Sequence, residues 1–301
     1  MKRLVIRSTE YQELLKNYEH WLRSLGYADQ TIKSFPVHVR EFMYWLEQRH
    51  CLSIRNLKME YEEEYRNYLE SRENEVTGGG LSSYAINKQL VSINNFMSYL
   101  LAHNRGLFTL HFKTIECTGK REILNKKEVK SLYEVSREQG REGKYFRGQR
   151  DRAILGIYYG CGLRLSEGIN LDVDDIDFRN QKLLVRKGKG RKEREVPIAL
   201  GCLDDLEEYI REGREWYLKK DTDALLLNCY GSRLKSSGIY YNLSRLKSEA
   251  MIIKDTSVHG LRHSVATHLL RAGMNLDKIR EFLGHASLES TQIYTHIAYE
   301  N

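Results

Sequence analysis

Apolar residues recur at intervals of three and four over most of this 301-residue chain, with a short interruption between residues 182 and 198. Such spacing is typical of amphipathic helices, which bury one face against their neighbours. Within the interruption, the apolar runs 183–185 and 196–198 flank a basic segment that contains glycine, a pattern that predicts a β-hairpin. The sequence therefore predicts a mainly α-helical protein with one small sheet.

A chain of this length is expected to form two domains, because single hydrophobic cores stop growing before about 300 residues. Cap residues and apolar spacing predict amphipathic helices over 8–26, 29–46 and 59–71, followed by a long helix that starts at Ser82 or Ser83. The periodicity lapses near residue 113. The predicted division is a four- to five-helix domain over 1–112, a linker over 113–124 and a mixed α+β domain over 125–301.

Charge and cysteine content narrow the class of protein. The formal net charge of +7 favours a polyanionic partner, while 48 basic against 41 acidic residues indicates a patterned surface. The five cysteines form no C-x-x-C pair, so neither a disulfide framework nor a zinc site is predicted. The N-terminus has no signal-like apolar core, and no run of eighteen apolar residues occurs. We therefore expect a cytoplasmic protein without metal, cofactor or membrane partner.

The predicted hairpin is unusually basic. Between residues 182 and 194, one acid, Glu193, stands against seven basic residues, which are Lys182, Arg186, Lys187, Lys189, Arg191, Lys192 and Arg194. This density favours contact with a phosphate backbone over a plain solvated hairpin, since each contact releases counterions without reading sequence. Charge alone does not decide which lysine, if any, takes part in chemistry.

Two arginines stand in patterns that suit a phosphate ligand. Arg164 precedes Glu167 by three residues near an expected helix start, and His259 precedes Arg262 by three, which places both on one helix face. The alternatives are a surface Arg–Glu ion pair and a capping histidine beside a surface arginine. Each pattern alone leaves both interpretations open.

Tyr294 is one of twenty tyrosines, so by itself it is expected in a core or an interface. It follows His285 by nine residues, in a short polar helix predicted to start near Ser287, where a tyrosine has less reason to be buried. A phenol can attack phosphorus to form a covalent ester, while guanidiniums clamp the phosphate and lysine or imidazole groups move protons. Together these residues supply what is needed to cut a DNA strand without water or metal.

In order and spacing, these residues resemble the tyrosine recombinase (phage integrase) family, most closely its Xer-like members. The matching stretches are Gly162-Leu163-Arg164-Leu165-Ser166-Glu167, Gly188-Lys189-Gly190 with Lys192-Glu193-Arg194, His259-Gly260-Leu261-Arg262-His263, Leu283-Gly284-His285 and Thr291-Gln292-Ile293-Tyr294-Thr295-His296. The similarity covers residues 122–301. The N-terminal part is similar to the family's SAM-like core-binding domain but carries no comparable motif.

The resemblance implies a role for each matching residue. Arg164 and Arg262 would hold the nonbridging oxygens of the scissile phosphate, and Tyr294 would be the nucleophile of a 3′-phosphotyrosyl intermediate. Lys189 would protonate the leaving 5′-oxygen. His259 would accept a proton or bind the phosphate, His285 would be a second phosphate donor, and Glu167 would orient Arg164.

The resemblance also implies a C-shaped clamp around duplex DNA with inverted repeats, a dimer on each site and a tetramer at synapsis. Further DNA contacts are expected from residues on the exposed helix faces and the hairpin, although solvated faces look alike: Arg40, Ser83, Tyr84, Asn87, Lys88, Arg191, Lys192 and Arg194. The tail after Tyr294 is shorter than the helix that many relatives donate to a neighbour, so the resemblance leaves open whether a C-terminal swap couples the protomers. The lack of an arm-binding domain favours the simpler Xer-like or small mobile-element class. The alternatives are a type IB topoisomerase and a noncatalytic DNA-binding regulator.

Overall fold

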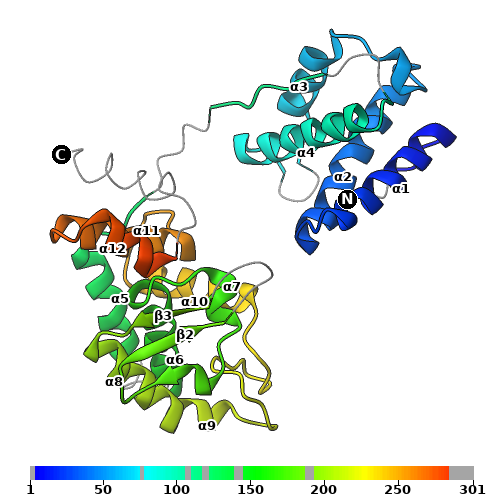
Figure 1. Ribbon diagram of the computed structural model, residues 1–301. Helices are drawn as coiled ribbons and strands as arrows, with labels where there is room; N and C mark the ends of the chain where they lie inside the picture. Colours follow the sequence, from blue (N-terminus) through cyan, green and yellow to red (C-terminus); the bar gives the residue numbers. More distant parts are fainter. Residues whose placement is uncertain are drawn as a thin grey trace. The chain divides into compact units, whose positions relative to one another are not determined.

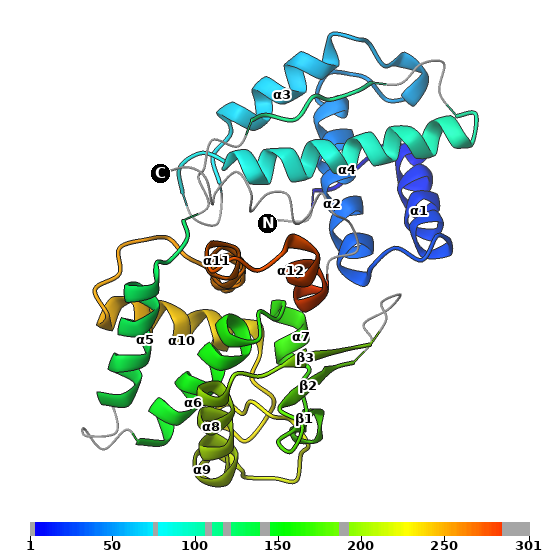
Figure 2. The same ribbon diagram turned by 60° about the vertical axis from the view of Figure 1, so that its left-hand side comes forward.

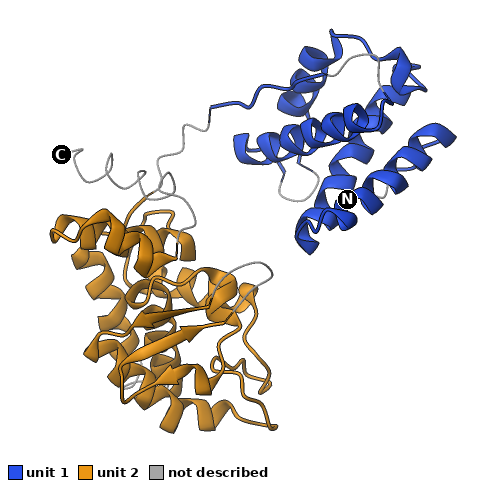
Figure 3. Cartoon of the chain, in the orientation of Figure 1, with its two compact units in different colours: residues 1–119 blue, residues 120–301 orange. Residues whose placement is uncertain are grey.

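The computed structural model describes residues 4–74, 78–105, 110–116, 122–138, 145–186 and 193–284. The chain forms two compact units, residues 1–119 and 120–301 (Figure 3). The division between them falls inside the segment 113–124 that the sequence assigns to a linker. Among the described residues, no helix is both long enough and apolar enough to cross a membrane.

The first unit is mainly helical in its described part, as predicted (Figure 1). Its elements are α1 (Thr9–Ser24), α2 (Asp29–Glu47), the 3₁₀ turn Ile54–Asn56, α3 (Tyr61–Ser71) and α4 (Ser83–Ala102). Ser8 and Ser82 cap α1 and α4, because each hydroxyl accepts a hydrogen bond from the backbone N–H three residues later. Aromatic rings fill the core, where Tyr18, Phe42, Tyr65 and Phe96 are fully buried.

An extended segment, residues 110–116, lies along α4 and is held there by two asparagines. Asn94 donates to the Phe112 carbonyl at 2.8 Å and accepts from the Phe112 N–H at 2.9 Å. Asn87, two turns earlier, makes the same pair of bonds with Ile115, both at 2.7 Å. Each amide thus satisfies both backbone groups of one residue. With Leu110 and Phe112 buried in the core, the segment is an integral part of the first unit.

The second unit combines helices with a three-stranded antiparallel sheet, which confirms the predicted mixed α+β class (Figure 2). Its helices are α5 (Lys126–Glu138), α6 (Tyr145–Leu155), α7 (Leu165–Ile169), α8 (Leu200–Glu208), α9 (Arg214–Tyr217), α10 (Ser236–Glu249), α11 (Val258–Arg271) and α12 (Leu276–Leu283). One 3₁₀ turn covers Val173–Asp175, and π-helical turns cover Gly156–Gly160 and Tyr209–Gly213. The apolar spacing predicted the helices but none of these turns.

The predicted hairpin is formed by β2 (Lys182–Val185) and β3 (Arg194–Pro197), with Leu183 opposite Val196 and Val185 opposite Arg194. Leu183, Val185 and Val196 point into the core, whereas Leu184 is partly exposed. A third strand, β1 (Ile176–Asp177), pairs with β2 and was not predicted, since two residues carry no recognisable alternation.

The base of the hairpin is tied to the turn that precedes β1. Arg186, next to the end of β2, donates to Asp172 at 2.9 Å and forms an ion pair with Asp175 at 2.5 Å. Asp172 also pairs with Arg233, which donates to the carbonyls of Ile169 and Leu171. The strand ends that lead to the basic tip are therefore anchored on one side by an ionic network.

Candidate active site

Arg164 stands at the start of α7, as the sequence predicts, directly after a tight turn. Gly162 in that turn has a φ of +60°, and a Cβ there would lie 2.9 Å from Leu283 and 3.0 Å from Phe282. Glycine is required for both reasons, because it tolerates positive φ and leaves room for α12. The close approach places Arg164 at the C-terminal end of α12, where its Nη2 donates to the Gly284 carbonyl at 2.9 Å.

Arg262 on α11 reaches the same end of α12. Its side chain is fully buried; Nη1 donates to the Gly162 carbonyl at 2.5 Å and Nη2 to the Leu283 carbonyl at 2.6 Å. Arginine is rarely buried this deeply unless its donors are used. The two arginines thus hold adjacent carbonyls of α12, so two of the predicted site residues lie together although 98 positions separate them in the chain (262 minus 164).

Glu167 connects Arg164 to a third arginine. Its carboxylate accepts from Arg164 Nη1 at 2.7 Å and from the Arg164 backbone N–H at 2.9 Å. It also accepts from the two terminal nitrogens of Arg194 on β3, at 3.1 and 2.9 Å. Burial by itself would raise the pKa of Glu167, but the hydrogen bonds from Arg194 and Arg164 lower it to about 2.

The charges at this cluster leave it cationic. The guanidiniums of Arg164 and Arg194 pair with the ionised Glu167, and that of Arg262 lies at the neighbouring Leu283 carbonyl, so the formal sum of these four groups is +2. Partial negative charge at the end of α12 offsets part of this, since helix C-terminal carbonyls carry it. Arg164 is 23% exposed and has five N–H donors, of which the bonds to Glu167 and Gly284 use two. The cluster is therefore suited to bind an anion at Arg164.

His259 lies in the first turn of α11, one turn before Arg262. Its side chain is exposed, and its ring packs edge-on against His263 with ring centroids 4.3 Å apart. Ser257 caps the helix by accepting from the Gly260 N–H, which fixes where this first turn begins. An imidazole at this position is accessible to a ligand that approaches the exposed start of α11.

The other predicted site residues, Lys189, Arg191, Lys192, His285 and Tyr294, lie outside the described residues. The structure therefore brings Arg164 and Arg262 together at the end of α12, with His259 on the helix that carries Arg262. The described chain stops at Gly284, whose carbonyl Arg164 binds and which directly precedes His285. Direct roles in chemistry remain predictions for all six residues.

Predicted DNA contacts in the first unit fall on α2 and α4. Tyr84 and Lys88 are exposed, and Arg40 and Ser83 are half-buried. Asn87 is half-buried and its amide holds Ile115, a structural use that its sequence position did not indicate.

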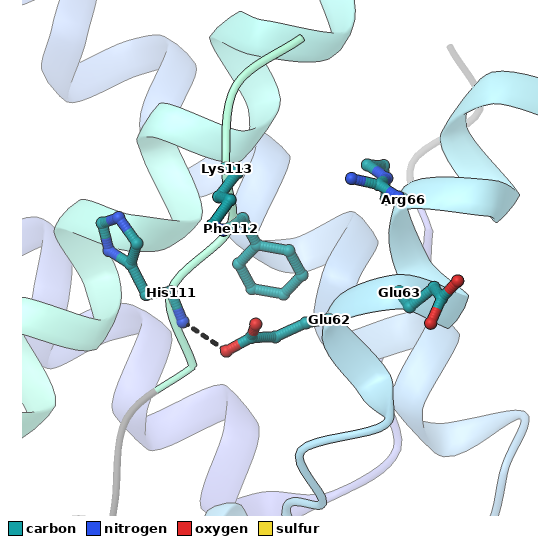
Figure 4. Close-up of a pocket in the computed structure, with 6 residues that line it drawn as sticks. All are labelled: Glu62, Glu63, Arg66, His111, Phe112 and Lys113. Carbon is teal, nitrogen blue, oxygen red and sulfur yellow. Dashed lines mark hydrogen bonds between the residues drawn. The ribbon is translucent and has the colours of Figure 1, made fainter.

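A surface hollow in the first unit lies apart from these predicted residues (Figure 4). Its lining residues are Glu62, Glu63, Arg66, His111, Phe112 and Lys113. Glu62 accepts a hydrogen bond from the His111 backbone N–H at 2.6 Å, and this bond helps to hold the extended segment. Its two carboxylates are balanced by Arg66 and Lys113, so the formal charge of the lining is close to zero.

Sequence reasoning identified Gly284 as a candidate helix C-cap, which the structure confirms, but it missed the close approach at Gly162 and the main-chain oxygens that organise the cluster. Gly162 and Gly284 both have positive φ, and the carbonyls of residues 162, 283 and 284 receive the two arginines. The only hint of these contacts in the sequence was a glycine next to each charged motif. No group of three or more His, Cys, Asp or Glu suited to a metal ion is found in the part of the chain that the structure describes.

The lowered pKa of Glu167 predicts a specific sensitivity to acid. Because its folded-state pKa is about 2 against an ordinary 4.5, the stabilisation is present above about pH 4.5 and is lost as the pH falls towards 2. Between about pH 5 and pH 3, the unfolding free energy of the unmodified protein should fall more than that of Glu167→Gln. Urea unfolding at several pH values measures this, with Glu193→Gln as a control at an exposed position. Equal pH dependence of Glu167→Gln and the unmodified protein would contradict the assignment.

Comparisons with known proteins show which family this chain belongs to. The model of the phage integrase family matches residues 122–301. A tyrosine recombinase XerC of Listeria innocua is 31% identical over 301 residues, covering 97% of this chain and 96% of that protein. A XerC of Oceanobacillus iheyensis is 45% identical over 157 residues, a match that spans 51% of each chain. The crystal structure of XerH bound to difH substrate shares the fold with a TM-score of 0.72, at 21% identity over 97% of this chain and 96% of that one.

The chain therefore belongs to the phage integrase family, and within it the chain is a Xer-like tyrosine site-specific recombinase. The resemblance predicted from the sequence motifs is confirmed. Neither of the two alternatives, a type IB topoisomerase or a noncatalytic regulator, is favoured by these matches.

Proposed function

We propose that this recombinase cuts and rejoins duplex DNA with Tyr294 as its nucleophile and with Arg164 and Arg262 as the clamp for the scissile phosphate. The observation that carries the proposal is a pair of contacts within the cationic cluster: Arg164 donates to the Gly284 carbonyl and Arg262 to the Leu283 carbonyl. These two carbonyls lie at the C-terminal end of α12, and residue 284 directly precedes His285 in the chain. Residue types and order match the family whose model covers this unit.

In the first step, the Tyr294 oxygen attacks phosphorus and the bond from phosphorus to the 5′-oxygen breaks. The phenolic proton leaves to His259 or to solvent, and Lys189 supplies a proton to the departing 5′-oxygen. In the second step, a 5′-hydroxyl from another strand attacks the phosphotyrosine and the tyrosine regains a proton. One phosphate ester bond forms for each one that breaks, so no nucleoside triphosphate is consumed.

The arginines act on the charge that develops during attack. The pentacoordinate phosphorus carries more negative charge on its nonbridging oxygens than the starting diester, and guanidinium forks match that geometry. A clamp that is already held by protein carbonyls needs little reorganisation when this charge appears. Water is scarce around the buried Arg262, which strengthens its electrostatic effect.

The partner in this proposal is a duplex with inverted repeats, bound by one protomer per half-site and brought together as a tetramer. XerH is a relative of the same fold whose structure is a complex with its difH substrate. In this chain, Arg40, Ser83, Tyr84 and Lys88 would contribute contacts from the first unit and the basic hairpin from the second. Because the substrate is genomic or mobile-element DNA, the reaction would take place in the cytoplasm.

Recombination between two sites tests the function. A duplex selected by the protein from a random-sequence pool, here called the selected site, is placed twice in one supercoiled plasmid. We expect resolved or inverted plasmid products that depend on both copies. Relaxation of plasmids without the selected site would instead indicate a topoisomerase, and binding without any strand breakage would indicate a regulator.

A further inference from the structure

Arg194 makes the most complete side-chain contact at the site, although the sequence suggested only a DNA contact for it. It is the last described ladder residue of β3 on the tip side, opposite Val185. Its two terminal nitrogens meet both carboxylate oxygens of Glu167, and the side chains are 17% and 9% exposed. Such a paired fork fixes the plane of the carboxylate as well as its position.

The same carboxylate determines where Arg164 lies. Oxygen Oε1 of Glu167 accepts from both Arg164 Nη1 and Arg194 Nη1, and Oε2 accepts from the Arg164 backbone N–H and Arg194 Nη2. Without Arg194, half of these bonds are lost and Arg164 must neutralise more of the negative charge of Glu167. Arg164 would then be drawn towards the carboxylate, with less positive charge available to a phosphate.

A glycine braces Arg194 from the other side. A Cβ on Gly284 would lie 2.7 Å from Arg194 Nε and 2.9 Å from Cζ, so the guanidinium lies directly against the main chain of that residue. The Gly284 carbonyl receives Arg164 Nη2 at 2.9 Å. Arg194 thus contacts both groups that hold the Arg164 guanidinium, the Glu167 carboxylate and residue 284.

From this geometry we propose that Arg194 is a positioning residue that keeps Arg164 directed at the scissile phosphate by holding Glu167 and Gly284. The proposal rests on the proposed role of Arg164 as a phosphate clamp. It assigns Arg194 a function in the chemical step, distinct from DNA affinity, even though Arg194 lies in the basic hairpin.

Substrates with altered phosphates separate this positioning role from two other roles, an effect on protonation of the leaving group and direct contact with the DNA backbone. Single-turnover cleavage at saturating enzyme is measured on nicked selected-site duplexes that carry one of three scissile groups. The first is the native phosphodiester. The second is a methylphosphonate, whose missing negative charge removes the need for an arginine. The third has sulfur in place of the bridging 5′-oxygen, which removes the need to protonate the leaving group.

For Arg194→Gln, we expect native cleavage to slow by about 10- to 100-fold, on the scale of one lost transition-state contact. The methylphosphonate should be cleaved within about 3-fold of the unmodified protein's rate, and the bridging-sulfur substrate should show the full native defect. The affinity for the selected site should change by less than about 2-fold. Arg194→Lys, which keeps the charge and loses the fork, should give a smaller defect of the same kind.

Arg179→Gln is the matched control, because Arg179 is an exposed arginine in the β1–β2 turn of the same sheet. It should cleave all three substrates within about 2-fold of the unmodified protein, which separates loss of one positive charge from loss of position. Thermal unfolding of each variant, compared with the unmodified protein, verifies that it is folded.

Three results would overturn the positioning role. Rescue of Arg194→Gln by the bridging-sulfur substrate would indicate a role through Lys189, and a defect confined to affinity, with a shallower salt dependence, would indicate direct phosphate contact. Cleavage by the folded Arg194→Gln variant at the unmodified rate would indicate no role in the chemical step. Failure of the unmodified protein to cleave the native duplex would reject the proposed function itself.

Discussion

Replacement of Tyr294 by phenylalanine should abolish the covalent protein–DNA complex while DNA binding persists. The substitution removes one oxygen and keeps the ring, so packing changes little and the nucleophile is lost. A missing nucleophile is not compensated by the arginine clamp, and losses on the order of 10⁴-fold or more are usual for such residues.

A nicked, end-labelled selected-site duplex provides the measurement, because loss of the short 5′-hydroxyl fragment traps the phosphotyrosyl intermediate on a denaturing gel. Tyr230→Phe and Tyr241→Phe are the matched controls, since both side chains are well exposed, at 77% and 64%. Both should form the adduct at the unmodified rate. Equal adduct formation by Tyr294→Phe would transfer the nucleophile to another residue and reject the mechanism.

Replacement of Arg262 by lysine should have the second largest effect, and it should act on rate and stability together. Lysine retains the charge but does not span the Gly162 and Leu283 carbonyls that the guanidinium joins. A buried carbonyl left without its donor costs about 1–3 kcal/mol of unfolding free energy. Loss of the fork at the phosphate should slow cleavage by about 10²- to 10³-fold.

Two companion variants separate these effects. Arg164→Lys should slow cleavage similarly with a smaller stability loss, because Arg164 is 23% exposed. Arg150→Lys should lower stability without slowing cleavage, since Arg150 is a nearly buried arginine that donates to the Leu227 carbonyl away from the site. Urea unfolding and single-turnover cleavage measure the two quantities. A folded Arg262→Lys variant that cleaves at the unmodified rate would remove Arg262 from the clamp.

The sequence predicted the elements that depend on local pattern. Helix limits followed from caps such as Ser8 and Ser82, and the hairpin from two short apolar runs around a glycine-rich basic turn. The Arg164–Glu167 contact was predictable because three residues separate the partners at a helix start.

Contacts between distant segments were not predictable in this way. Arg194 and Glu167 lie 27 positions apart on a strand and a helix, so their pairing depends on how the sheet packs against α7. The use of Asn87 depends on an extended segment 28 residues away, and an asparagine on a helix face looks the same whether it meets solvent, DNA or main chain. Charge composition indicated a basic hairpin without showing that Arg194 has a carboxylate partner.

The asparagine pairs on α4 bear on how this enzyme is divided into separately produced halves. Leu110 and Phe112 complete the N-terminal core. The side-chain amides of Asn87 and Asn94 hydrogen-bond to the backbone of the segment 110–116, as a neighbouring strand would. A fragment that stops at Ala102, where α4 ends, would expose an apolar groove and leave both asparagine amides without their backbone partners. An expression boundary that preserves this half intact belongs after residue 116.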